Sequence, residues 1–215
     1  MPVDPSPTAS SVPSTPRRLL AEWLPLVAAL VLLLAARDTL ANHYQVPSGS
    51  MQPTLVPGDR VAVDMRAYGA RVPFTSIRLT EGTSPAPGDV VVFDSPLDGT
   101  RLIKRLVAVE GQTVAVQQGR LWVDGPRSEI DHDPLAAEQA YERIGPRRVQ
   151  LDLADGGGPD LPPLRIPEGM ALVLGDHRGA SFDSRGFGLV PLDAFYGRAI
   201  AVYHRSGEGF VWKRL

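Results

Sequence analysis

The sequence predicts a mainly β fold, a barrel-like or sandwich-like sheet domain that follows one N-terminal apolar segment. Two observations favour this class. Short runs of alternating or continuous apolar residues recur between turns rich in Gly and Pro, and no long amphipathic helix pattern follows the apolar segment. Strands are expected at 60–65, 90–93, 102–109, 113–117, 120–123, 170–174, 198–203 and 210–213.

The middle of the chain contains one hairpin signal and one interruption of the strand pattern. Two of the expected strands should pair across Gln118-Gly119, a short hairpin turn. The following stretch, 125–167, is polar and rich in Pro and Gly. We interpret it as an excursion from the sheet, with a short helix near 134–144 and one strand near 148–153.

The N-terminal part combines a polar tail with one long apolar run. Residues 1–18 are rich in Pro, Ser and Thr and end in Arg17-Arg18, which is typical of a disordered tail. Residues 19–38 have the length and composition of a single transmembrane helix. A cleaved signal peptide is the alternative, although only a weak cleavage site follows the run. The positive-inside rule puts the tail in the cytoplasm and the β domain, 42–215, outside.

Composition excludes several kinds of chemistry. A net charge of −2 gives no electrostatic footprint for nucleic acid. The chain has no cysteine, and its 4 histidines are scattered, so we expect neither a thiol nucleophile nor a metal site. Of the 22 basic residues only Lys104 and Lys213 are lysines. A lysine at a buried position can lose its proton, which an arginine does not do.

Ser50 is the candidate nucleophile. It lies in the stretch 46–55, between Pro47 and Pro53 and directly after Gly49. The prolines restrict the backbone and the glycine permits a turn, which would present a serine rigidly at the edge of a sheet. An ordinary polar loop after a membrane anchor is the alternative.

Lys104 is the candidate base. It lies inside an apolar strand, where alternation puts Lys104 and Arg105 on opposite faces. Because an arginine resists burial without a partner, the lysine could be the inward residue; that both lie in solvent at a strand end is an equal alternative. Burial lowers a lysine pKa from about 10.4 toward 7–8, at which the amine can take a proton from Ser50. The backbone N–H of Ser50 and the Ser48 hydroxyl could then stabilise an oxyanion.

A third stretch, 175–188, is dense in Asp, Arg and Ser. Asp183 could form an ion pair with Arg185 or Arg178 that makes the loop rigid, and Ser181 could orient the lysine amine. A solvated charged loop is the alternative. A Ser-His-Asp triad would use His177 with Asp183 or Asp176, but no nucleophile-elbow pattern accompanies Ser50.

Four stretches occur in the order of one known family after an N-terminal anchor. They are 47–55, 88–93, 103–105 and 175–185. In these motifs the chain resembles bacterial type I signal peptidases (leader peptidases). The resemblance implies a signal-peptidase-like β catalytic domain and a Ser–Lys dyad protease without cofactor. It also implies that the protease removes signal peptides from exported preproteins, after small residues, at the outer face of the cytoplasmic membrane.

The resemblance assigns a role to each matching residue. Ser50 becomes the nucleophile and Lys104 the general base. Oxyanion-hole, lysine-orienting and supporting roles fall to Ser48, Ser181, Asp183 and Arg185. The substrate would lie as an added strand beside positions that form shallow apolar pockets: Gln45, Val46, Pro47, Met51, Leu102 and Ile103.

The partners implied are exported preproteins and membrane lipid, with neither nucleic acid nor an obligate protein partner. The chain departs from the family at His177, where Asn is common, and at Gly179-Ala180. It also has one anchor where some members have two. Three alternatives remain open: a self-cleaving repressor of the SOS type, a relative dedicated to a pilin or conjugation protein, and an anchored peptide-binding module.

Overall fold

The computed structural model describes residues 23–30, 41–70, 79–125, 130–133 and 136–215, and within these it omits the side chains of 41–42 and 130–139. Contact density separates residues 1–37 from the domain 38–215. Of the expected transmembrane segment 19–38, only residues 23–30 are described, and they are helical. No helix in the described ranges is both long and apolar enough to cross a membrane. The expected tail, 1–18, lies outside the described residues.

The domain is mainly β, as the apolar pattern predicts. A short helix, α2 (Ser184–Phe187), and a 3-10 turn, η1 (Leu192–Ala194), lie between strands. In the described part of the chain the strands are β1 (Ala41–Gln45), β2 (Arg60–Asp64), β3 (Val90–Asp94), β4 (Arg101–Val109), β5 (Thr113–Gln117), β6 (Arg120–Val123), β7 (Ile130–Asp133), β8 (Ala136–Ile144), β9 (Arg147–Asp152), β10 (Leu161–Arg165), β11 (Met170–Leu174), β12 (Val190–Pro191), β13 (Gly197–Arg205) and β14 (Gly209–Arg214).

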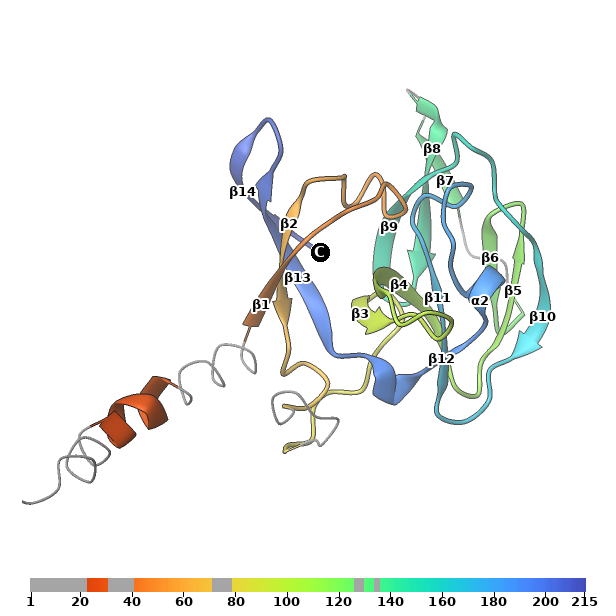
Figure 1. The fold of residues 1–215 in the computed structure, drawn as a ribbon. Helices are drawn as coiled ribbons and strands as arrows, with labels where there is room; N and C mark the ends of the chain where they lie inside the picture. The colour runs from red at the N-terminus through yellow and green to blue at the C-terminus, as the bar shows by residue number, and fades with distance from the viewer. Residues whose placement is uncertain (1–22, 31–40, 71–78, 126–129, 134–135) are drawn as a thin grey trace, which may run out of the picture. The chain divides into compact units, whose positions relative to one another are not determined.

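One large antiparallel sheet organises these strands. Its order is β1-β2-β13-β3-β4-β11-β12, with β14 paired to β13 (Figure 1). Two smaller sheets, β10-β5-β6 and β7-β8-β9, complete the domain. The β5–β6 hairpin has the expected two-residue loop, because Gln118 and Gly119 both have positive φ, 52° and 75°. Such a loop matches the twist of the flanking strands.

The excursion at 125–167 contains a sheet of its own, and the helix predicted near 134–144 is wrong. Residues 136–144 form β8, which pairs with both β7 and β9. The burial of Ala140, Glu142 and Ile144 alternates with the less buried Tyr141 and Arg143, which is the period of a strand. Pairing on both edges outweighs the helix propensity of Ala, Glu and Gln in this segment. The strand expected near 148–153 is confirmed as β9.

The inserted sheet packs on the main sheet through a shared core. Buried side chains of β8 and β9, Ile144, Val149 and Leu151, join a cluster with Leu172 and Leu174 of β11. Figure 1 shows β5, β6 and β9 gathered beside β4 and β11. A second cluster lies under β2, β3 and β13 and supports the segment that follows β1.

The glycine-rich stretch of the excursion docks backbone against backbone. A Cβ added to Gly157 would lie 2.0 Å from the carbonyl carbon of Gln118, and one added to Gly119 would lie 2.6 Å from the Cα of Gly157. A Cβ added to Gly158 would lie 2.5 Å from the backbone oxygen of Arg178. These glycines therefore form part of the packed domain.

Candidate active site

The segment that carries Ser50 is a tight turn between β1 and β2. The N–H of Gln52 donates to the carbonyl of Gly49 at 3.0 Å. The N–H of Leu55 donates to the carbonyl of Met51 at 2.9 Å. A Cβ at position 49 would meet Gln52 Oε1 at 2.5 Å, so a larger residue there would require the Gln52 side chain to move. Because Met51 is fully buried in the core, the turn is anchored while Ser50 stays half-buried.

Lys104 lies directly against this serine. Its Nζ donates to Ser50 Oγ at 2.6 Å. Lys104 is 3% exposed and pairs through its backbone with Val91 of β3. Strand β11 pairs with β4 only from Arg105 onward, so Lys104 lies where the other edge of β4 becomes free. The lysine side chain is therefore shielded from solvent, while the backbone beside it lies at the part of β4 that does not pair with β11.

Burial lowers the pKa of Lys104 to about 8, because an ammonium group is poorly solvated there. The negative charges of Asp183 and Asp176 oppose this shift in the pKa, and the positive charge of Arg185 adds to it. A substantial fraction of the amine is then neutral near physiological pH.

Arg105, on the opposite face of β4, is buried as well. The sequence allowed a buried lysine but not a buried arginine beside it. The guanidinium donates from Nε and Nη2 to the two carboxylate oxygens of Asp176, each at 2.7 Å. Its Nη1 donates to the carbonyl of Gly88 at 2.8 Å. A bidentate carboxylate is what allows an arginine to be buried. Both faces of β4 are covered at this point.

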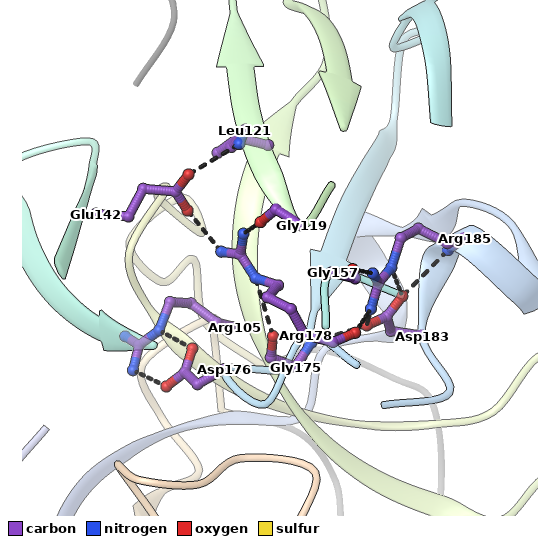
Figure 2. A network of polar contacts seen from close by, with 10 residues as sticks. All are labelled: Arg105, Gly119, Leu121, Glu142, Gly157, Gly175, Asp176, Arg178, Asp183 and Arg185. Atoms are coloured by element: carbon purple, nitrogen blue, oxygen red, sulfur yellow. Dashed lines mark hydrogen bonds and ion pairs between the residues drawn. The ribbon is translucent and has the colours of Figure 1, made fainter. Parts of the chain in front are cut away.

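The loop before α2 is held by Asp183 and Arg185, the pair that the sequence allowed. Arg185 donates from Nε and Nη2 to the Asp183 carboxylate, both at 2.8 Å (Figure 2). Asp183 Oδ2 also accepts from the N–H of Gly175 at 3.0 Å. Burial alone would raise the pKa of Asp183, but the Arg185 contacts and the Gly175 N–H outweigh it and hold the pKa below its usual range. Arg178 pairs elsewhere, with Glu142.

The two other predicted serines flank Ser50. Ser48 Oγ donates to Ser50 Oγ at 3.4 Å, a long contact. The Ser181 hydroxyl is buried and forms no hydrogen bond of good geometry among the described residues. A Cβ on Gly175 would meet Ser181 Oγ at 2.2 Å and the carbonyl oxygen of Ser50 at 2.4 Å. Gly175 thus allows Ser181 and Ser50 to approach each other.

The His177 side chain does not form the alternative triad. Its Nε2 lies 3.0 Å from Asp155 Oδ2, a carboxylate of the excursion, and its ring makes no hydrogen bond to Ser50 in the described part of the chain. The contribution of His177 to the site is its backbone, because its N–H donates to the carbonyl of Ser50 at 3.2 Å.

The residues expected to contact substrate lie along two strand edges. β1 is the outer strand of its sheet, and the first half of β4 lacks a neighbour on the β11 side within the described residues. Arg101 of β4 donates to the Tyr44 hydroxyl of β1 at 3.1 Å, so the two edges approach each other. Exposure along them differs: Gln45 and Pro47 are exposed, Leu102 and Ile103 are half-buried, and Val46 and Met51 are buried. Because Met51 is buried, it could contact a substrate side chain only from the bottom of a pocket.

Sequence reasoning missed two residues that shape the site. Asp176 was considered only as a triad member, whereas it pairs with Arg105. Glu142 was placed in a predicted helix. A strand reading of 136–144 would have put this carboxylate between the buried Ala140 and Ile144 and so required a buried cationic partner.

A serine hydroxyl in contact with a buried lysine is an arrangement that could attack an acyl carbon, the chemistry of one class of hydrolases. Comparison with known proteins gives the family within that class. Residues 20–204 match the family described as signal peptidase, peptidase S26. The chain therefore belongs to the signal peptidase I family of serine endopeptidases.

Two sequence relatives agree with this assignment, and one solved structure matches part of the chain. The chain is 34% identical to a probable signal peptidase I-1 of Synechocystis sp., over 89% of this chain and 85% of that protein. It is 32% identical to signal peptidase I of Pseudomonas aeruginosa, over 81% and 68%. A crystal structure of a signal peptidase I from Enterococcus faecalis matches at 32% identity and a TM-score of 0.37, over 54% of this chain and 97% of that one.

Proposed function

We propose that this chain is a membrane-anchored endopeptidase that removes N-terminal signal peptides from exported preproteins, with Ser50 as nucleophile and Lys104 as general base. The observation that carries the proposal is the 2.6 Å contact between Lys104 Nζ and Ser50 Oγ at a buried position, where the pKa of the lysine is lowered to about 8. A neutral amine at that distance can accept the serine proton.

The reaction then follows in two halves. Lys104 takes the proton from Ser50 as Oγ attacks the scissile carbonyl, and the oxyanion receives hydrogen bonds from the Ser50 N–H and the Ser48 hydroxyl. The Lys104 ammonium returns its proton to the leaving amine as the acyl ester on Ser50 forms. The same amine then deprotonates a water molecule that attacks the ester, and Ser50 Oγ leaves, taking the proton back from the Lys104 ammonium as the acid product is released. Asp183 and Arg185 keep the loop beside the lysine rigid, and Ser181 would orient the lysine amine.

The substrate lies extended between the two free strand edges. Main-chain hydrogen bonds from β1 near Gln45 and from β4 near Ile103 would hold it as an added strand. Because Val46 and Met51 are buried beneath this position, the pockets are shallow and apolar, which favours small side chains at the first and third positions before the cut.

The apolar run within 19–38 anchors the enzyme in the cytoplasmic membrane as a single span. Arg17 and Arg18 precede it, so the N-terminus lies in the cytoplasm and the catalytic domain on the outer side. This orientation exposes the domain to preproteins as they emerge from the membrane.

Cleavage of a preprotein by full-length protein in detergent tests the function. A substrate with Ala-x-Ala before the cut should be processed, and the same substrate with Leu at both alanines should not. Ser50→Ala should be inactive with an unchanged unfolding midpoint. Cleavage of neither substrate by the wild type would reject the peptidase proposal and favour a peptide-binding module.

The pH dependence of the rate should report the lysine. Only the neutral amine is active, so kcat/KM should rise about tenfold per pH unit below the Lys104 pKa, which is about 8, and level off above it. Initial rates on the Ala-x-Ala substrate between pH 6 and 10, with stability checked at each pH, measure the midpoint.

Asp183→Asn identifies the group that titrates. The Asp183 carboxylate raises the pKa of Lys104, so its removal should move the midpoint of the profile to lower pH. Asp98→Asn, at an exposed turn, is the matched control and should leave the midpoint in place. A midpoint that stays fixed in Asp183→Asn would contradict the assignment of the profile to Lys104.

A further inference from the structure

A fully buried ion pair joins the inserted sheet to the catalytic loop. Arg178 and Glu142 are both 0% exposed, and Arg178 Nη2 donates to Glu142 Oε2 at 2.6 Å. The other carboxylate oxygen of Glu142 accepts from the N–H of Leu121 at 2.8 Å. Arg178 also donates to the carbonyl of Gly119 and, from Nε at 3.2 Å, to the carbonyl of Gly175. Figure 2 shows the Arg178 side chain between Glu142 and Gly175.

Such a pair contributes little net stability, because the desolvation of both charges offsets their attraction. Its effect is geometric. Glu142 and Arg178 have few alternative partners at zero exposure, so the pair fixes where the backbone of Arg178 lies relative to β6 and β8. Apolar residues of the same volume would fill this space without imposing a direction.

The backbone beside Arg178 is the part of the loop that touches the nucleophile. The N–H of Arg178 donates to the carbonyl of Asp152 at 3.0 Å, and the N–H of Asp152 donates to the carbonyl of Asp176 at 3.0 Å. Between these two bonds, the N–H of His177 donates to the carbonyl of Ser50. Residues 176–178 are thus held on one side by β9 and contact Ser50 on the other.

The hydrogen bond from the His177 N–H to the Ser50 carbonyl leaves the Ser50 backbone little freedom to move. Ser50 Oγ and Lys104 Nζ must stay within hydrogen-bond distance for proton transfer, and a displacement of about 1 Å is enough to lower a rate by about 10²-fold. The substrate-binding edges at Gln45 and Ile103 receive no hydrogen bond from Arg178. A shift of the loop should therefore change kcat and leave KM nearly unchanged.

From these contacts we infer that Glu142 is a positioning residue for Ser50, acting through Arg178 and the His177 N–H. The inserted sheet is then part of the catalytic framework. This inference rests on the proposed function for its kinetic readout, whereas its structural readout, the protection of the His177 amide, does not.

The test uses two variants of the full-length protein. Glu142→Gln keeps an acceptor for the Leu121 N–H but leaves the Arg178 charge unpaired. The double variant Glu142→Gln/Arg178→Met removes both charges and keeps the volume. We expect Glu142→Gln to lower both the unfolding midpoint and kcat. The double variant should recover the midpoint while kcat stays 10- to 100-fold below wild type with KM within twofold.

Asp89→Asn is the matched control. Asp89 is also a buried carboxylate, bonded to the Tyr68 hydroxyl at 3.0 Å and near two arginines, but it makes no contact with 175–178. It should lower the unfolding midpoint with kcat within twofold of wild type. Recovery of kcat together with stability in the double variant would overturn the inference, since the pair would then be structural only.

Amide hydrogen exchange separates this inference from the proposed function. In both Glu142 variants the His177 N–H should exchange at least tenfold faster than in wild type, and in Asp89→Asn it should not. Unchanged protection of His177 in a folded Glu142 variant would overturn the positioning role. If the wild type cleaves nothing while the His177 N–H still exchanges faster in the Glu142 variants, the proposed function is rejected and the positioning role of Glu142 stands.

Discussion

Lys104→Met should abolish cleavage and make the protein more stable. Without a base, Ser50 keeps its proton, and kcat should fall by about 10³-fold or more. Stability should rise because the lysine pKa falls from 10.5 to about 8 on folding, which corresponds to about 3 kcal/mol against the folded state below pH 8. Methionine fills nearly the same volume without a charge.

The sign of the pH dependence makes this prediction specific. Between pH 8 and 10.5 the unfolded chain holds a proton that the folded chain has released, so wild-type stability rises with pH and the advantage of Lys104→Met shrinks. Urea unfolding at pH 7 and near pH 10.5 measures both. Lys213→Met, at the exposed second lysine of the chain, is the control and should change neither activity nor stability. A Lys104→Met protein with near-wild-type kcat would refute the base assignment.

Asp176→Asn should lower the free energy of unfolding by about 3–5 kcal/mol, because it leaves the buried guanidinium of Arg105 without its carboxylate. Activity should fall as well, since Asp176 lies in the loop whose backbone contacts Ser50. Urea unfolding at neutral pH gives the change in stability.

The double variant Arg105→Met/Asp176→Leu separates the two consequences. It removes both charges and should recover most of the lost stability. If Asp176→Asn alone were as stable as wild type, the acceptors that Arg105 already has, the Gly88 carbonyl and the Thr54 hydroxyl, would be sufficient to keep its guanidinium buried.

The sequence predicted best where local chemistry decides the structure. The turn at Ser50 falls in the Gly49 segment between the two prolines, and the hairpin turns at Gln118-Gly119, the two residues that the sequence indicated. The apolar surroundings of Lys104 in β4 made an inward lysine possible but left open a position in solvent at a strand end. Each of these features depends on neighbours within a few residues.

The failures concern partners that lie far away along the chain. The burial of Arg105 depends on Asp176, 71 residues later, and that of Arg178 depends on Glu142, 36 residues earlier. The segment of Glu142 contains good helix formers, so its local propensity contradicted the strand that β7 and β9 impose. No pattern within one segment could have revealed these pairs.

The close docking of Gly157 on the Gln118-Gly119 turn has a consequence for anyone who alters the gene. A run of three glycines usually tolerates substitution and is a convenient place to insert an epitope tag. Here even one methyl group at position 157 meets main-chain atoms that cannot yield, and one at position 158 would lie 2.5 Å from the carbonyl oxygen of Arg178. In a saturation library positions 157 and 158 should therefore tolerate few substitutions, and a tag belongs at the exposed β13–β14 turn, 206–208.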